Sequence, residues 1–236
     1  MPGAAPVAPP PAGYPPGTVV VYEPAPPPPP PADDGTWRNH DGFYLRMGIG
    51  AGYGRVKSTG EFQTGLEGAS TDVEIVYSGG GPAYELLIGG TPGGGVVVGG
   101  GFVGQDISDP KVEVDGEELD GDLFDDDDSL GMVLFGPFVD WFPDPHGGAH
   151  VGAMIGVAAI GLSDGGDEDD NESSTGWGGS LWGGYDFWVA NQWSLGAEGR
   201  VAYLSTHRDF GGSSTVNAEA DDRGLTFEVL FTALYH

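Results

Sequence analysis

The order of short and long connections between alternating segments is the feature that most constrains how this chain can fold. From Gly42 onward, apolar residues alternate with small or polar ones with a period of two, which is typical of β-strands. Eight such segments cover residues 43–54, 83–90, 96–103, 130–141, 150–162, 178–189, 193–204 and 225–235. Long polar connections at 57–80, 104–129, 162–176 and 204–224 alternate strictly with short turns at 91–94, 143–148 and 189–192. This order places every long loop at one end and both termini at the other, as in transmembrane β-barrels with up-and-down topology.

The faces of the strands agree with this topology. In the first segment, Phe43, Met47, Ile49 and Tyr53 share one face, and glycines and Arg46 share the other. A membrane barrel turns its apolar side chains toward lipid and can keep polar ones inside. We therefore expect an all-β fold: an eight-stranded antiparallel up-and-down transmembrane β-barrel with long acidic extracellular loops.

The segment 130–141 is harder to orient, because both of its faces are largely apolar and Pro137 cannot donate a ladder hydrogen bond. The outward face is expected to carry Val133, Phe135, Val139 and Trp141.

Aromatic residues gather at both ends of the segments, which predicts two girdles at the level of the lipid headgroups. The girdle at the short turns is expected to contain Trp37, Phe43, Trp141, Trp188, Trp193 and Tyr235. The girdle at the long loops is expected to contain Tyr53, Trp177 and Tyr203.

The inward faces carry charge, which needs partners when it is buried. The expected lumen residues are Arg46, Glu85, Asp186, Glu198, Arg200 and Glu228. Similar depth on neighbouring strands predicts the ion pairs Arg46–Glu85 and Arg200–Glu228. An eight-stranded barrel is just wide enough to be filled by its own side chains, so we expect a plugged lumen. The excess of acids leaves a narrow cation-preferring channel as an alternative.

The net charge of −28, from 36 acids against 8 basic residues, excludes a nucleic-acid-binding surface of the usual basic kind. The acids are densest in 115–128 and 163–174, within two of the long loops. A solvated, self-repelling surface accounts for them. The alternative is weak binding of Ca²⁺ or Mg²⁺ by Asp125, Asp126, Asp127, Asp128, Asp167, Asp169 and Asp170, although the spacing is not that of an EF-hand. No other cofactor is expected, and the absence of cysteine excludes thiolate metal sites and disulfides.

Residues 1–40 precede the barrel and are rich in proline, with an unbroken run from Pro26 to Pro31. This composition predicts a disordered or extended periplasmic tail, with the barrel occupying 41–236. No signal peptide is recognisable after Met1, and we expect that one has been removed.

The segments 41–54 (DGFYLRMGIGAGYG), 136–145 (GPFVDWFPDP) and 178–194 (GGSLWGGYDFWVANQWS) resemble small Gram-negative outer-membrane β-barrel proteins. This group includes the OmpA transmembrane domain and OmpX-like proteins. The resemblance implies a barrel in the bacterial outer membrane that contacts lipid and lipopolysaccharide and is inserted by the barrel-assembly machinery. We expect a monomer.

The expected role is structural or interactive, in envelope integrity, adhesion or binding through the surface loops. Because some outer-membrane barrels modify lipids, a lipid-modifying enzyme is an alternative. Ser205, His207 and Asp209 are the nearest to a catalytic set, but their proximity on one loop is not the geometry of a triad. No enzyme activity is therefore expected.

Overall fold

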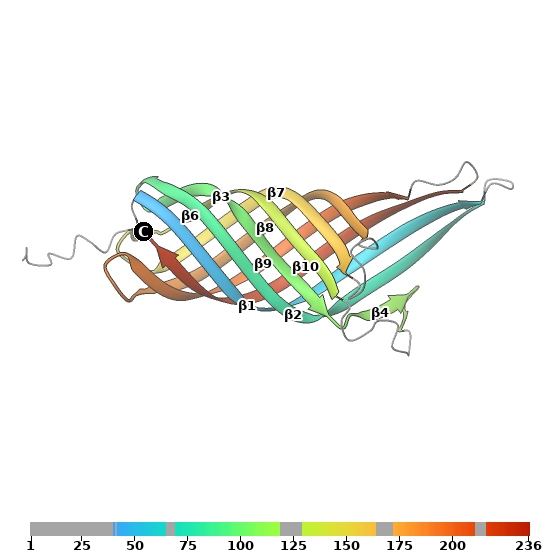
Figure 1. Cartoon of the computed structure of the whole chain (residues 1–236), viewed down its shortest axis with the longest axis horizontal. Coiled ribbons are helices and arrows are strands. Elements are labelled where there is room, and N and C mark those ends of the chain that lie inside the picture. The colour runs from blue at the N-terminus through green and yellow to red at the C-terminus, as the bar shows by residue number, and fades with distance from the viewer. Residues whose placement is uncertain (1–39, 41, 65–68, 119–128, 164–171, 211–215) are drawn as a thin grey trace, which may run out of the picture. The chain divides into compact units, whose positions relative to one another are not determined.

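The computed structural model describes residues 40, 42–64, 69–118, 129–163, 172–210 and 216–236, and these residues form a closed antiparallel β-barrel (Figure 1). Its eight barrel strands are β1 (Gly42–Thr64), β2 (Ala69–Gly93), β3 (Val96–Ser108), β6 (Ser129–Trp141), β7 (Ala149–Ser163), β8 (Glu172–Trp188), β9 (Trp193–Phe210) and β10 (Val216–Tyr235). Each strand pairs with its neighbours in the chain, and β1 pairs with both β2 and β10, which closes the barrel. The predicted fold class, an eight-stranded up-and-down barrel, is confirmed. The part of the chain that the structure describes contains no helix that could span a membrane.

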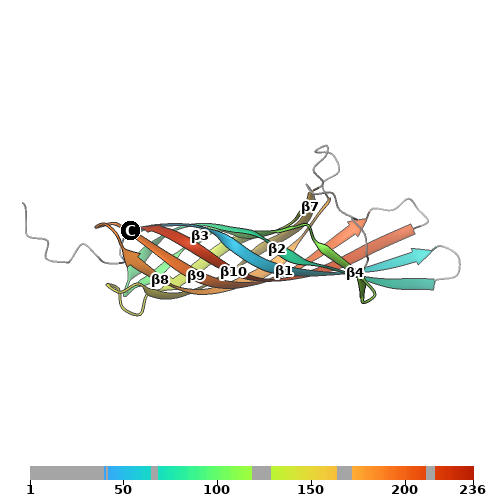
Figure 2. The ribbon, with the colours of Figure 1, turned by 90° about the horizontal axis from the view of Figure 1, so that it is seen from below.

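The strands continue well beyond the segments predicted from apolar alternation. The ladder between β1 and β2 runs to Thr64 and Ala69, and that between β1 and β10 runs to Thr64 and Val216, so much of the predicted loops 57–80 and 204–224 is strand. These extensions form the long hairpins that project beyond the barrel wall in Figure 2. Within the predicted loop 104–129 lie two short strands, β4 (Lys111–Val114) and β5 (Glu117–Glu118): β4 pairs with β2, and β5 pairs with β4. Backbone pairing continues there because it needs only hydrogen-bond partners, whereas the apolar face that reveals a strand in the sequence has ended.

Side chains alternate between the lumen and the outer wall along every barrel strand. On β1, Ile49 is 69% exposed whereas Arg46 is fully buried, and on β10, Val229 is 69% exposed whereas Leu230 is buried. Of the four outward residues predicted for β6, Phe135, Val139 and Trp141 are exposed and Val133 is half-buried. Pro137 lies in a ladder whose register to β7 is the same on both sides of it.

Glycine makes room for large side chains inside the narrow barrel. The Trp182 ring lies over Gly152, where a Cβ atom would come within 2.3 Å of it. By contrast, Gly199 faces outward, and a Cβ atom there would meet nothing within 4 Å. Inward glycines are therefore part of the packing, and at least one outward glycine is not.

The short-turn end of the lumen is filled by rings. The His40 ring stacks on Phe142 with centroids 3.6 Å apart, and its Nδ1 lies 3.2 Å from Nδ1 of His236. The second ring nitrogen of His40 lies 2.8 Å from the carbonyl oxygen of Gly147. His40 was expected to belong to the tail, and instead it packs on the barrel; the rest of the predicted tail, 1–39, lies outside the described residues.

Candidate functional site

Eight charged or titratable side chains from seven strands meet inside the barrel, and we call them the lumen cluster. They are Arg46 of β1, Glu85 of β2, Asp140 of β6, His150 of β7, Asp186 of β8, Glu198 and Arg200 of β9, and Glu228 of β10. All are at most 5% exposed. Each is placed there by the period-two alternation, which turns alternate residues of every strand into the lumen.

One half of the cluster is organised around Arg46. Its guanidinium nitrogens lie 2.9 Å from a Glu198 oxygen, 3.1 Å from Asp140 and 3.2 Å from Asp186. Its Nε lies 3.9 Å from Glu85. A planar guanidinium carries five N–H donors and can pair with several carboxylates at once, so Arg46 links side chains from four other strands.

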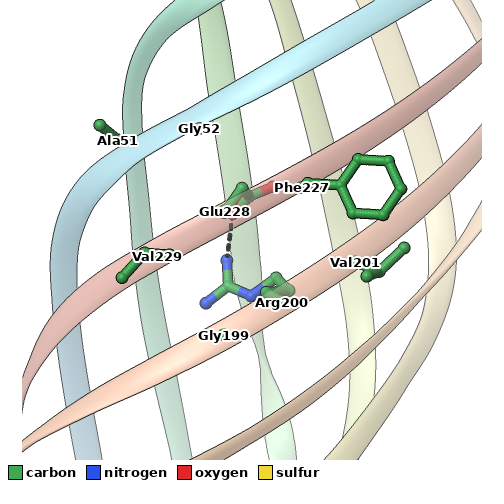
Figure 3. A pocket seen from close by; sticks show the side chains of 8 residues that line it. All are labelled: Ala51, Gly52, Gly199, Arg200, Val201, Phe227, Glu228 and Val229. Atoms are coloured by element: carbon green, nitrogen blue, oxygen red, sulfur yellow. Dashed lines mark hydrogen bonds and ion pairs between the residues drawn. The ribbon is translucent and has the colours of Figure 1, made fainter.

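The other half is organised around Arg200. Its nitrogens contact Glu85, lie 2.8 Å from Glu198 and lie 3.1 Å from Glu228. Figure 3 shows the contact with Glu228 through the wall of β9 and β10, beneath a shallow outer hollow at Gly199. Thr226 donates a hydrogen bond to the remaining oxygen of Glu228 at 2.7 Å. Glu198 and Glu85 contact both arginines and so join the two halves.

All six predicted lumen residues lie in this cluster, and both predicted pairs are in contact. The shortest contacts of Arg46, however, are with residues across the lumen and not with Glu85. Sequence reasoning missed Asp140, which accepts a hydrogen bond from Tyr44 at 2.9 Å, and His150, whose Nδ1 lies 3.3 Å from Asp140. Asp140 lies between Val139 and Trp141, which were already assigned to the outward face. Because side chains alternate along a strand, this position could have identified Asp140 as a lumen residue.

The cluster holds more negative than positive groups: five carboxylates against two guanidiniums. One oxygen of Glu85 and both amide atoms of the buried Gln105 have no hydrogen-bond partner in the described structure. No group of three or more histidine, aspartate or glutamate side chains among the described residues has a geometry suited to a metal ion. Protons or small hydrated cations are the natural compensation for such an excess.

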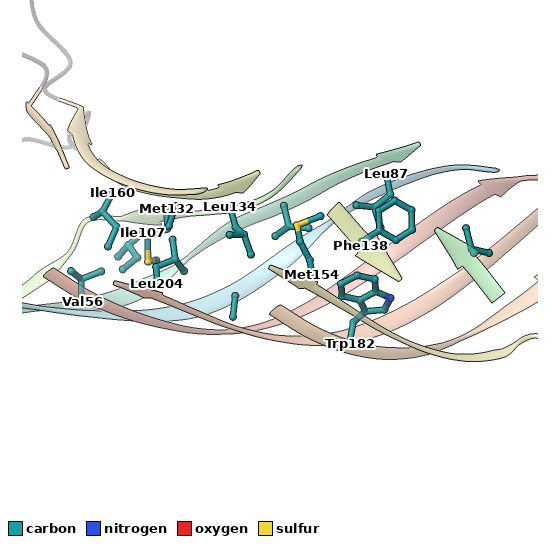
Figure 4. Close-up of a cluster of buried hydrophobic side chains, with 14 of the residues drawn as sticks. Val56, Leu87, Ile107, Met132, Leu134, Phe138, Met154, Ile160, Trp182 and Leu204 are labelled. Atoms are coloured by element: carbon teal, nitrogen blue, oxygen red, sulfur yellow. The ribbon is translucent and has the colours of Figure 1, made fainter. Parts of the chain in front are cut away.

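An apolar belt lies in the lumen on the loop side of the cluster (Figure 4). Its members are all at most 2% exposed: Val56, Ile107, Leu130, Met132, Leu134, Ile160 and Leu204. On β1, β6, β7 and β9, the belt residues lie nearer the long connections than the cluster residue of the same strand, as Leu204 does relative to Arg200. Ile107 lies at the loop end of β3, a strand that contributes no residue to the cluster. The belt and the rings at the turn end therefore enclose the charges from both sides.

The predicted girdle residues lie mostly on the outer wall. The exposed members are Phe43, Trp141 and Trp193 at the turn end and Tyr53, Trp177 and Tyr203 at the loop end. Within the girdles, the rings of Trp193 and Tyr235 are 5.2 Å apart and those of Trp177 and Tyr203 are 5.9 Å apart. Trp188 differs, because it occupies an inward-facing position of β8 and its ring lies 4.7 Å from that of His236. It therefore packs with the rings that fill the short-turn end of the lumen. Trp37 lies outside the described residues.

The acidic candidates for cation binding, Asp125 to Asp128, Asp167, Asp169 and Asp170, also lie outside the described residues. Of the catalytic candidates, Ser205 and His207 both lie on the outward face of β9. Nδ1 of His207 lies 2.8 Å from Asp221 of the neighbouring strand, so Asp221 is a carboxylate partner of His207. The side chain of Asp209, the third catalytic candidate, lies outside the described part of the structure.

No family model matches this sequence, and no curated protein matches it either. Among solved structures, the outer membrane protein OprG from Pseudomonas aeruginosa is 12% identical with a TM-score of 0.48, covering 84% of this chain and 99% of OprG. Neisserial surface protein A is 14% identical with a TM-score of 0.43, covering 79% of this chain and 96% of that protein. The outer membrane protein AlkL is 12% identical with a TM-score of 0.44, covering 84% of this chain and 92% of AlkL. The chain is similar to these outer-membrane barrel proteins, and its own strand pairing shows it to be a closed eight-stranded antiparallel β-barrel.

Proposed function

We propose that this chain is an integral protein of the bacterial outer membrane whose role is structural and interactive, with a lumen plugged by its own side chains. The observation that carries the proposal is the inversion of polarity across the barrel wall. Large apolar side chains are exposed outside, among them Ile49, Val229, Leu181, Phe187 and Ile155 at 64–69% exposure, while the two arginines and five carboxylates of the lumen cluster are buried inside. A continuous exposed apolar wall is unfavourable in water and favourable in lipid.

The enclosed lumen supports a structural role over a transport role. The lumen cluster is bounded by rings at the turn end and by the apolar belt at the loop end. A hydrated ion crossing the barrel would have to separate paired charges and then pass the apolar belt, whose buried residues include Met132 and Leu204.

The envelope roles that fit such a barrel are stabilisation of the membrane, adhesion, and binding of partners by the segments that project beyond the wall. Its partners in this proposal are outer-membrane lipid, lipopolysaccharide and the barrel-assembly machinery, and it acts as a monomer.

The test begins with the electrophoretic mobility of the refolded chain in SDS, unheated and boiled. A shift on heating is expected, because closed membrane barrels resist SDS until heated. Folding in detergent-free buffer without such a shift would overturn the membrane assignment. Bilayer recordings on the SDS-resistant form are then expected to show no regular single-channel steps.

A narrow cation-preferring channel is the second candidate, favoured by the excess of carboxylates in the lumen cluster. If steps do appear, replacing Glu198 by Gln should change their cation preference. Enlargement of the conductance on Met132→Ala would place the apolar belt on the conduction path.

A lipid-modifying enzyme is the third candidate and rests on Ser205 and His207. Release of fatty acid or a change in lipid mass in vesicles containing the barrel, abolished by Ser205→Ala, would favour it over the structural role.

A further inference from the structure

Half of the basic residues in this very acidic chain lie together on the outer wall at the loop end. They are Arg55 and Lys57 of β1, Arg223 of β10 and Lys111 of β4, and we call them the basic rim. Strand register brings them together: Lys57 is directly opposite Arg223, while Ser78 of β2 is opposite both Arg55 and Lys111. The chain has only 8 basic residues and a net charge of −28, so this gathering needs a physical reason.

The basic rim begins where the apolar wall ends. Arg55 follows Tyr53 on the outward face of β1, and Arg223 precedes Leu225 on the outward face of β10. Tyr53 and Leu225 are 54% and 40% exposed on that wall. Tyr53 was predicted as a member of the loop-end girdle, so in a membrane the rim lies at the level of the lipid headgroups or just above it.

The Lys57–Arg223 pair is the centre of the rim. Side chains directly opposite each other on antiparallel strands have Cβ atoms only about 4.5–5.5 Å apart, and like charges at such positions are destabilising. On the other side of Arg223 lies Ser205, which carries no charge. The nearest acid on its own face is Asp221, which contacts His207. An anion held between Lys57 and Arg223 would remove the repulsion.

Carboxylates partly neutralise the other members. Lys57 lies 2.6 Å from Glu74, Lys111 lies 3.4 Å from Glu118 and Arg55 lies 4.0 Å from Glu113. All six side chains are at least 40% exposed, and ion pairs between exposed groups contribute little, so they can rearrange around a more highly charged ligand. Arg223 has no ion pair within the described structure.

We infer that the basic rim binds the phosphate groups of a phosphorylated lipid in the leaflet at the long-loop end, with the lipid's apolar part lying against Tyr53 and Leu225. The inference rests on the proposed membrane insertion. The ligand chemistry follows from the juxtaposition: a cationic pair for phosphate directly above an apolar wall for acyl chains fits an anionic amphiphile. In a bacterial outer membrane this description fits lipid A, the phosphorylated and acylated anchor of lipopolysaccharide.

The test uses the full chain refolded in phosphatidylcholine nanodiscs containing a small fraction of lipid A, with retained lipid A counted by native mass spectrometry over a titration. Lys57→Gln/Arg223→Gln is the test variant. Ala190→Glu/Asn191→Glu, in the exposed turn at the opposite end, is the control because it changes the net charge by the same amount. At about 1 kcal/mol for each basic residue near an anionic membrane surface, the test variant should bind lipid A roughly 30-fold more weakly, whereas the control should match the wild type.

Three results would overturn the inference. If the test variant and the wild type retain equal amounts of lipid A, the basic rim does not bind the lipid. If the control variant binds lipid A as weakly as the test variant does, the loss comes from the change in net charge and not from the rim. Equally tight binding of phosphatidylglycerol in parallel nanodiscs would show that the rim holds any anionic phospholipid and would overturn the assignment to lipid A. The heat shift in SDS is measured on every variant. If the heat shift is present in every variant, the barrel is inserted and a negative result counts against the lipid site alone. If membrane insertion itself fails, the wild type loses the heat shift as well.

Discussion

Removing the Arg200 guanidinium should destabilise the barrel strongly, and the loss should depend on Glu228. Arg200 is 2% exposed and contacts Glu85, Glu198 and Glu228. Glu198 keeps Arg46 at 2.9 Å when Arg200 is lost, but Glu228 has no second cation among the described residues. Glu228 is therefore the carboxylate that Arg200→Met leaves buried and unpaired.

The magnitude follows from this difference. Breaking a buried pair by removing one partner costs about 3–5 kcal/mol, so Arg200→Met should lower the free energy of unfolding by that amount. Glu228→Gln keeps an oxygen that can accept from Thr226 and Arg200, and it should cost about 1–3 kcal/mol. In the double variant no unpaired charge remains at position 228. The double variant should therefore be more stable than the sum of the single effects predicts, with a coupling of about 1–3 kcal/mol.

The assay is urea unfolding of the barrel in lipid vesicles, followed by tryptophan fluorescence and by the heat shift in SDS. A second cycle on Lys57 and Glu74 provides the control, because this pair is closer, at 2.6 Å, but is 46% and 44% exposed. Its coupling should not exceed about 1 kcal/mol. Additive losses at Arg200 and Glu228, or a coupling no larger than that of the exposed pair, would refute the reasoning that burial and not distance sets the strength of these pairs.

Two further predictions concern packing and pH. Gly152→Ala should destabilise the barrel by about 1–3 kcal/mol, because its Cβ atom would come within 2.3 Å of the Trp182 ring. Gly199→Ala is the control and should be nearly neutral, because a Cβ atom there meets nothing within 4 Å. Similar urea midpoints for the two variants would contradict this prediction. Burial lowers the pKa of His40 to about 4 and that of His236 to about 3, from 6.5, so the unfolded chain takes up protons first as the pH falls. Stability contributed by these neutral rings should be present above pH 6.5 and be lost as the pH falls toward 4 and then 3. Urea midpoints measured from pH 7.5 to 4 should fall less steeply when both histidines are replaced by Phe, and an unchanged slope would contradict the assignment.

The sequence predicts the inside and outside of this barrel well because side-chain parity is a local property. Once the outward face of a strand is recognised, Arg46 and Arg200 must point into the lumen. Parity does not determine which strands face each other across the lumen, since this depends on strand tilt and stagger. For this reason neighbouring strands suggested Glu85 as the partner of Arg46, whereas its short contacts are with Asp140, Asp186 and Glu198.

Strand ends are less predictable for a related reason. The alternation of apolar and polar residues reports where one face meets lipid or packed side chains, and it stops near Arg55 on β1. The ladder itself continues to Thr64 because the polar residues beyond still pair in register with β2 and β10.

The seam between β1 and β10, paired from Leu45 with Tyr235 to Thr64 with Val216, has a consequence for how the barrel is made. Every other barrel ladder joins strands that follow one another in the chain, so those ladders can form locally and early, whereas this one must wait for the last strand. Until then β1 and the growing end of the sheet both present unpaired backbone groups, which invite pairing with other chains. Truncation within β10 should therefore leave an open, aggregation-prone sheet, and closure of the seam should be the slowest step of folding.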